Sequence, residues 1–177
     1  MNAAVKEVYD SVRSVNPALV LSAAIWPVYK PIPGIGSSKG YDDYFQDPRA
    51  WANGAYLDVA NPMTYPASRT SATYTVTNAS CPSLDWTCLL NDHRAAFEQT
   101  AGRHVYIGVG AIKGWTEVQK QMDKGRAQLA TGYSFYSYSQ VDTVLFAPGQ
   151  PAGSGWTLLG NSYFKYPAVV PAMPWKE

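Results

Sequence analysis

Residues 104–138 read HVYIGVGAIKGWTEVQKQMDKGRAQLATGYSFYSY, and this stretch decides the fold. His104 to Val109 is a short apolar run, which is typical of a strand buried on both faces. Thr116 and Gln119 have the spacing of a capping box that opens a helix, and Tyr133 to Tyr138 forms the next strand. The helix is expected to turn three apolar side chains inward: Val118, Met122 and Leu129. Strand, helix and strand in this order predict a right-handed βαβ unit with parallel strands.

The same alternation precedes this unit. Apolar residues at helical spacing predict a first helix from Val5 to Val15, and the continuous apolar run from Leu19 to Ile25 predicts a strand buried on both faces. Asp47-Pro48 fits the start of a short helix, because proline is favoured at the first helical position. A second strand follows from Tyr56 to Ala60, and Asp85 can cap the helix after it. The order α-β-α-β-α-β-α-β predicts a parallel sheet with helices on at least one face.

Two α/β architectures fit this order: an open nucleotide-binding sheet and a barrel. An open Rossmann-type sheet usually carries a G-x-G-x-x-G turn, and Gly108-Val109-Gly110 lacks that spacing. Long, aromatic-rich loops after the strands favour a (β/α)₈ barrel, but a complete barrel has eight strands in about 250 residues. Four strands are visible in this chain. We therefore predict a partial (β/α)₈ TIM barrel in residues 1–146 and a Pro- and Gly-rich tail, residues 147–177, that packs on the barrel.

Composition argues against several classes of function. Hydrophobic residues make up 46% of the chain and charged residues 15%, and the net charge is +1 with no basic cluster, so nucleic acid is a poor partner. No apolar run approaches the ~20 residues that a membrane span needs. Cys81 and Cys88 have no second Cys or His pair at zinc-ligand spacing, so we expect no metal and no cofactor. A short-loop disulfide between them fits an exported protein, and the sequence leaves both redox states open.

Five segments carry a resemblance to a known family in their order and spacing: LSAAIWPVY (Leu21–Tyr29), GYDDYFQDPRAW (Gly40–Trp51), LDVANPMTYP (Leu57–Pro66), RHVYIGVGAIKGW (Arg103–Trp115) and YSFYSYSQVD (Tyr133–Asp142). With the tail GNSYFKYPAVVPAMPWK they resemble the C-terminal half of the glycosyl-hydrolase-like family 10. This is a group of bacterial and mostly exported proteins. The resemblance covers residues 1–175.

The resemblance implies a (β/α)₈ barrel that acts on polysaccharide or peptidoglycan-type glycan outside the cytoplasm, although no signal peptide opens this chain. In that alignment the four strands are strands five to eight, and the first helix is helix four. The acidic motif of the family, at the end of strand four, would lie before Met1. Asp42-Asp43-Tyr44 imitates that motif but follows strand five, so the role of the motif is not transferred to it.

Glycoside hydrolysis ordinarily uses two carboxyl groups, which in a barrel stand at the C-terminal ends of strands. Only the last predicted strand has an acid shortly after its end, and Asp142 is therefore the candidate catalytic residue. Asp58 lies inside a strand and is expected to form a structural pair. The strand ends otherwise carry aromatic and polar side chains that suit either sugar rings or ordinary packing. The candidate substrate-binding residues are Trp26, Asn61, Tyr65, Lys113, Tyr136 and Tyr138.

Three functions stay open at this point. The chain is a fragment of a glycoside hydrolase that contributes substrate-binding strand ends, a non-catalytic glycan-binding protein, or an inactive truncated product. In each case a four-stranded half-barrel leaves an unpaired edge on either side of the sheet, which promotes aggregation. We expect the missing N-terminal half-barrel, or self-association, to cover these edges.

Overall fold

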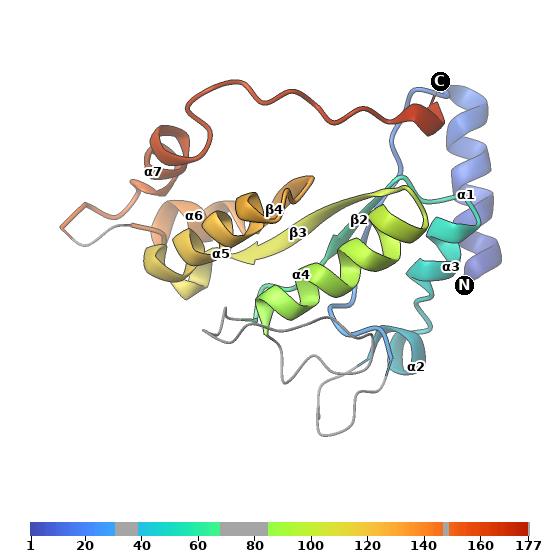
Figure 1. Cartoon of the computed structure of the whole chain (residues 1–177), viewed down its shortest axis with the longest axis horizontal. Coiled ribbons are helices and arrows are strands. Elements are labelled where there is room, and N and C mark those ends of the chain that lie inside the picture. The colour runs from blue at the N-terminus through green and yellow to red at the C-terminus, as the bar shows by residue number, and fades with distance from the viewer. Residues whose placement is uncertain (31–38, 68–84, 147–148, 177) are drawn as a thin grey trace.

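The computed structural model describes residues 1–30, 39–67, 85–146 and 149–176, and a four-stranded sheet forms its centre (Figure 1). All neighbouring strands are parallel and follow one another in chain order. The strands are β1 (Ser22–Ile25), β2 (Val59–Pro62), β3 (His104–Gly110) and β4 (Gly132–Tyr136). The predicted α/β class with a parallel sheet is therefore confirmed.

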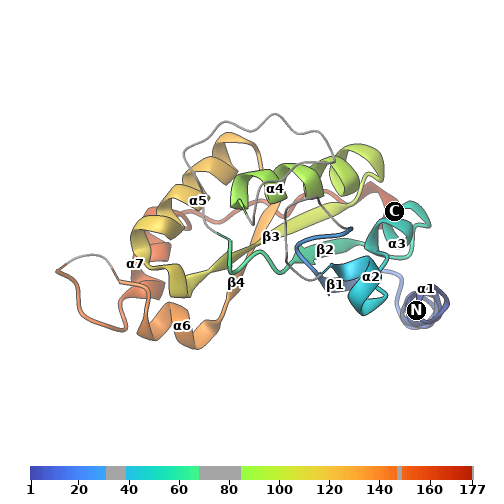
Figure 2. The same cartoon turned by 90° about the horizontal axis from the view of Figure 1, so that it is seen from below.

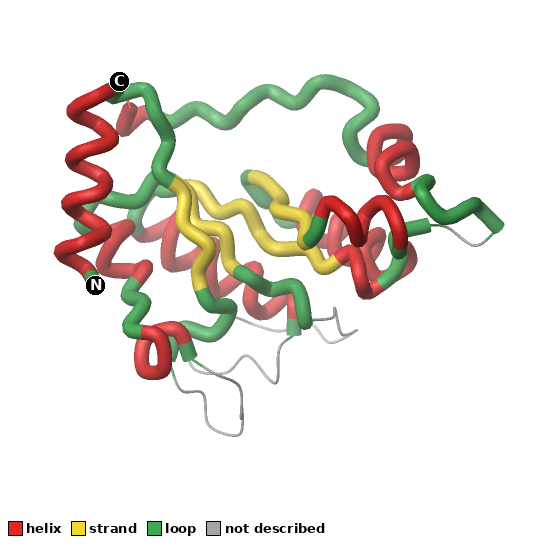
Figure 3. The backbone as a smooth tube through the Cα atoms, turned by 180° about the vertical axis from the view of Figure 1, so that it is seen from behind, coloured by secondary structure: helices red, strands yellow, loops and turns green. Residues whose placement is uncertain are grey.

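Helices cover one face of the sheet. In Figures 1 and 2, α4 (Trp86–Arg94) and α5 (Trp115–Ala127) lie across this face, and α1 (Asn2–Val15) stands at the β1 end. The remaining helical segments are shorter: α2 (Gly40–Tyr44), α3 (Pro48–Asn53), η1 (Ala95–Thr100), η2 (Ala111–Lys113), α6 (Tyr138–Thr143), α7 (Gly155–Ser162) and η3 (Pro174–Lys176). Figure 3 shows the opposite face, and no helix in the described part of the chain runs across the first three strands there.

Two aspartates cap helices as predicted. The Asp47 carboxylate accepts a hydrogen bond from the Ala50 amide at 3.1 Å, and the Asp85 carboxylate accepts one from the Cys88 amide at 2.8 Å. These bonds satisfy amide groups that the first turn of a helix leaves without a backbone acceptor. Asp47 thereby starts α3, and Asp85 starts α4, one of the two helices that cover the sheet.

The α5 helix differs from its prediction at both ends. Its N-cap is Gly114 without a side-chain cap, because the chain enters α5 directly from η2 and Thr116 lies inside the first turn; the predicted capping box does not form. Val118 and Met122 are buried, as predicted. Leu129 is not inward: it lies beyond the helix end with φ 57° and is 81% exposed. The helical periodicity of the sequence continues past Ala127, where the helix ends.

Two strands are shifted along the sequence relative to the prediction. β2 spans Val59–Pro62 instead of residues 56–60, and β4 ends at Tyr136 instead of Tyr138. The pairing partners set these limits, because Val59 lies opposite both Ser22 of β1 and His104 of β3. Tyr138 instead begins α6.

β1 is an edge strand, and among the described strands it pairs with β2 alone. The carbonyl oxygens of Leu21 and Ile25 accept hydrogen bonds from the β2 side, so in a parallel ladder the backbone groups of Ser22 and Ala24 point toward the free edge. Both of these residues are exposed, which corrects the prediction that residues 19–25 form a strand buried on both faces. The run is covered on one face only, since the described chain places no helix over the other.

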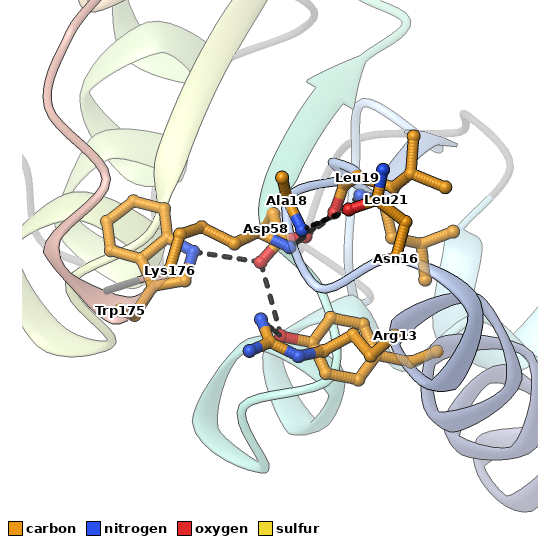
Figure 4. Close-up of polar contacts among 9 residues, drawn as sticks. Arg13, Asn16, Ala18, Leu19, Leu21, Asp58, Trp175 and Lys176 are labelled. Atoms are coloured by element: carbon orange, nitrogen blue, oxygen red, sulfur yellow. Dashed lines mark hydrogen bonds and ion pairs between the residues drawn. The ribbon is translucent and has the colours of Figure 1, made fainter.

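The C-terminal segment returns to the start of the sheet. After α7 the chain passes the side of the sheet opposite α2 and ends in η3 near α1 (Figures 1 and 2). Figure 4 shows Trp175 and Lys176 converging on Asp58: Trp175 Nε1 donates to Oδ1 at 2.8 Å, and Lys176 Nζ lies 2.6 Å from Oδ2. Asp58 is fully buried and also accepts the Leu21 amide at 2.8 Å. The predicted structural pair of Asp58 is therefore formed with Lys176.

Candidate functional site

The C-terminal ends of the four parallel strands lie at one edge of the sheet. Aromatic rings gather there in three pairs, each of which joins a residue that follows or ends a strand to a residue of another element. The pairs are Trp26 with Tyr44, Tyr65 with Tyr136, and Tyr138 with Trp156. These six residues are called the aromatic edge below.

The central pair stacks Tyr65 on Tyr136, with ring centroids 4.7 Å apart and an interplanar angle of 23°. Tyr65 reaches this place because the chain after β2 runs tightly against β3. Thr64 Oγ1 donates to the Gly108 carbonyl at 2.6 Å, and a Cβ at Gly110 would lie only 2.3 Å from the Tyr65 carbonyl oxygen. Tyr136 is 52% exposed, so the stacked pair offers ring surface to solvent.

The β1 end of the aromatic edge holds Trp26, whose ring centroid lies 4.2 Å from that of Tyr44 in α2. The Trp26 amide donates to Gln46 Oε1 at 2.9 Å, which fixes α2 beside the strand end. The next residue is anchored from the helix layer, since His93 Nε2 donates to the Pro27 carbonyl at 3.0 Å. Burial lowers the pKa of His93, so the imidazole is neutral and keeps its proton on Nε2 for this bond.

The β4 end of the aromatic edge pairs Tyr138 of α6 with Trp156 of α7, with ring centroids 4.9 Å apart. The two helices approach closely at Gly155, where a Cβ would lie 1.9 Å from the Val141 carbonyl oxygen. Sequence reasoning missed Trp156, because it names no candidate residue in the Pro- and Gly-rich tail, residues 147–177. The signal in the sequence is the apolar pair Leu158-Leu159, of which Leu159 is buried in α7.

The polar candidates lie on three different elements. Asn61 is half-buried in β2 opposite Ala24, and Lys113 is exposed at the end of η2. Asp142 is exposed on α6, and its side chain forms no hydrogen bond or ion pair with another residue of the described chain. In residues 1–30, 39–67, 85–146 and 149–176, no group of three or more His, Cys, Asp or Glu side chains is placed to hold a metal.

Two further properties concern the cysteines and the helices of the described chain. Cys88 is disulfide-bonded; Cys81, the other cysteine of the sequence, lies outside the described residues. None of the helices in the described ranges has both the length and the apolar character to cross a membrane.

Four of the six predicted binding residues belong to the aromatic edge: Trp26, Tyr65, Tyr136 and Tyr138. The structure brings Tyr65 and Tyr136 into direct contact and gives Trp26 and Tyr138 the partners Tyr44 and Trp156, which the prediction did not include. Comparisons of the chain with protein-family models, with curated proteins and with solved structures found no match, so the geometry of this edge is what points to a function.

Proposed function

We propose that this chain binds glycan along the aromatic edge, as strands five to eight of a glycosidase-like (β/α)₈ barrel. The observation that carries the proposal is the set of three ring pairs at the C-terminal ends of parallel strands, where barrels of this type build their sites. Aromatic rings with an exposed face suit the apolar C–H faces of sugar rings. The Asn61 amide and the Lys113 ammonium supply hydrogen bonds for hydroxyl, acetamido or carboxylate groups.

An apolar groove beside β1 and the unpaired backbone groups of that strand support the proposed half-barrel. A groove of about 280 Å³ lies between α1 and the free edge of β1, with mainly apolar walls that include Val5, Val8 and Leu57. A strand inserted there would find apolar contacts and the unpaired backbone groups of Ser22 and Ala24. We propose that four further strands complete the barrel at the β1 and β4 edges.

The helices indicate which partner completes the barrel. α1 already flanks the β1 edge. α6 and α7 follow β4, and the ring of Phe164, just after α7, meets the ring of Phe135 in β4 edge-on, with centroids 6.2 Å apart. If a second copy of the chain completed the barrel, β4 of one copy would lie beside β1 of the other. The helices after β4 and the α1 helix of the other copy would then compete for the same place. A complementary half with four strands and three helices fits better than self-association.

Bond cleavage is assigned to the complete barrel and not to this chain alone. Hydrolysis needs two carboxyl groups about 5–10 Å apart, and Asp142 is the single acid among the predicted site residues. We expect the purified chain to release no new reducing ends from chito-oligosaccharides or peptidoglycan glycan strands in a reducing-sugar assay. Hydrolysis by the wild type that disappears in Asp142→Asn would contradict this assignment and make Asp142 catalytic.

We place the protein outside the cytoplasm. Disulfides persist mainly in oxidising compartments, and the disulfide-bonded state of Cys88 supports such a location. The resemblance of the chain to exported proteins agrees with it.

Substitution of Tyr136 by alanine tests the proposed binding. The change removes the exposed half of the central ring pair, and we expect it to weaken binding of chitohexaose about tenfold in isothermal titration calorimetry. Tyr136→Phe keeps the ring and is expected to keep most of the affinity. The matched control is Tyr166→Ala, which removes a tyrosine that is 75% exposed but lies in the C-terminal segment. Equal affinity in Tyr136→Ala and Tyr166→Ala would reject the aromatic edge as the binding site.

A further inference from the structure

A pocket of about 520 Å³ lies between the end of α5, the start of β4 and the chain that follows α7. It is called the β4 pocket below, and all of its lining residues lie between positions 126 and 168, so neither end of the sequence forms one of its walls. α5 and α7 lie together at the β4 end of the sheet (Figures 1 and 2). Gly132 begins β4 and lines the pocket, whereas Tyr136 of the aromatic edge ends that strand. The β4 pocket is therefore separate from the aromatic edge.

Four aromatic side chains line the β4 pocket: Tyr133, Tyr163, Phe164 and Tyr166. Hydrogen bonds to α5 hold two of these rings, since Tyr133 Oη donates to the Met122 carbonyl at 3.2 Å and Tyr163 Oη donates to Asp123 Oδ1 at 2.8 Å. The Tyr133 ring also needs the missing side chain of Gly125, where a Cβ would lie 2.4 Å from the tyrosine Oη. The walls are therefore fixed by the fold, as is usual for small-ligand sites.

The charge of the lining is positive. Arg126 and Lys165 line the pocket, and no Asp or Glu of the described chain does. The Arg126 guanidinium donates to the Tyr163 carbonyl, and its Cζ lies 5.0 Å from the centroid of the Tyr163 ring. Among the residues that the structure describes, neither cation has an ion-pair partner. Because a guanidinium has five N–H donors, Arg126 keeps donors for an anion.

Two carboxylates contact the walls from outside the lining. Asp123 accepts the Tyr163 hydroxyl, and Glu98 accepts the Thr131 hydroxyl while it pairs with Arg94 at 2.6 Å. With Glu98 balanced in this way, the two cations of the pocket face one carboxylate. The tyrosines add no negative charge near pH 7, because burial raises the pKa of Tyr133 to about 12, and burial with the Asp123 hydrogen bond raises the pKa of Tyr163. The remaining positive charge favours an anionic ligand.

We propose that the β4 pocket binds a small ligand in which a ring carries one carboxylate. The carboxylate would lie between Arg126 and Lys165, and the ring would lie against the aromatic walls. Either a sugar acid or an aromatic acid has this chemistry, and the hydroxyls of Thr131 and Ser162 in the lining suit the hydroxyls of the sugar acid. This site goes beyond the proposed function, since it shares no residue with the aromatic edge.

The experiment is a ¹⁵N NMR titration that follows the backbone amides of Thr131 and Gly132 with three probes: methyl glucuronide, benzoate and methyl glucoside. We expect saturable shifts with at least one of the two acids, with a dissociation constant on the order of 1 mM, and at least about tenfold weaker binding of the uncharged glucoside. Arg126→Gln and Lys165→Gln should each weaken binding of that acid about fivefold. The matched control is Lys120→Gln, which removes an exposed cation of α5 that does not line the pocket.

The acid that binds more tightly identifies the source of the carboxylate as a sugar or an aromatic compound. The inference fails if neither acid shifts the Thr131 and Gly132 signals, if the glucoside binds as tightly as the acids, or if Arg126→Gln binds like Lys120→Gln. Its outcome is independent of the aromatic edge: Tyr136→Ala should leave binding of the acid unchanged, and a wild type that does not bind chitohexaose would reject the proposed function alone. Loss of the acid in Tyr136→Ala instead of Arg126→Gln would move the carboxylate to the aromatic edge and contradict the inference.

Discussion

Substitution of Asp58 by alanine is expected to lower the free energy of unfolding by about 3–5 kcal/mol. The carboxylate is fully buried and holds the start of the sheet to the C-terminal segment through Leu21, Trp175 and Lys176. Its removal leaves the Lys176 ammonium, whose side chain is itself largely buried, without an anion. Urea unfolding at pH 7, followed by tryptophan fluorescence, measures the loss.

The same variant is expected to change how stability depends on pH. Burial by itself raises the pKa of Asp58, but hydrogen bonds from Lys176, the Leu21 amide and Trp175 outweigh it and hold the pKa below its ordinary value of 3.8. A depressed pKa contributes stability that is complete above the unfolded-state value and is lost as pH falls through the folded-state value. The difference between wild type and Asp58→Ala should therefore be constant near neutral pH and shrink as the pH falls below about 4.

The matched control for Asp58 is Asp10→Ala. Asp10 pairs with Lys6 one helical turn away on the exposed surface of α1, and such pairs contribute about 0.3–0.5 kcal/mol. A loss in Asp58→Ala as small as that of Asp10→Ala would show that the C-terminal anchor is not structural. A loss that stays constant down to pH 3 would show that the charge of Asp58 is not what stabilises the anchor.

Gly110→Ala is expected to destabilise the fold by about 2–3 kcal/mol and to abolish glycan binding together. A Cβ at this position would lie 2.3 Å from the carbonyl oxygen, 3.1 Å from the carbonyl carbon and 3.2 Å from the Cα of Tyr65. All three are backbone atoms, so no side-chain rotation relieves the clash. The chain after β2 must move away from β3, and Tyr65 then leaves its stack on Tyr136. Urea unfolding and chitohexaose titration measure the two effects.

Gly160→Ala in α7 is the matched control for Gly110→Ala. Apart from its chain neighbours and the backbone of α7 itself, no atom would lie within 4 Å of a Cβ at Gly160, and alanine favours helix over glycine by up to about 1 kcal/mol. We therefore expect unchanged or higher stability and unchanged binding. A Gly110→Ala protein that matches Gly160→Ala in both measurements would mean that the close approach of β2 and β3 does not position the site.

The features that the sequence predicts correctly depend on local chemistry. Asp47 and Asp85 cap helices because their side chains meet amides only three residues away. The alternation of strands and helices implies parallel pairing, because a parallel connection needs a crossover of this length. For the site, the same logic placed Trp26, Tyr65, Tyr136 and Tyr138 after or at strand ends without contact information.

The features that the sequence misses depend on neighbours that are distant along the chain. The apolar residues before β1 predicted a doubly buried strand, but burial depends on a second layer that the described chain does not place there. The partner of Tyr138 is Trp156, and only the packing of α7 on α6 brings them together.

Indole N–H signals in a ¹⁵N NMR titration with chitohexaose test the binding of glycan at the strand ends most directly. Trp26 and Trp156 belong to the aromatic edge, whereas Trp175 lies at the opposite end of the strands, beside Asp58. Saturable shifts of the Trp26 and Trp156 signals, with Trp175 unchanged, are the predicted result. Shifts confined to Trp175, or no shift at any of the three, would contradict a glycan site on this edge.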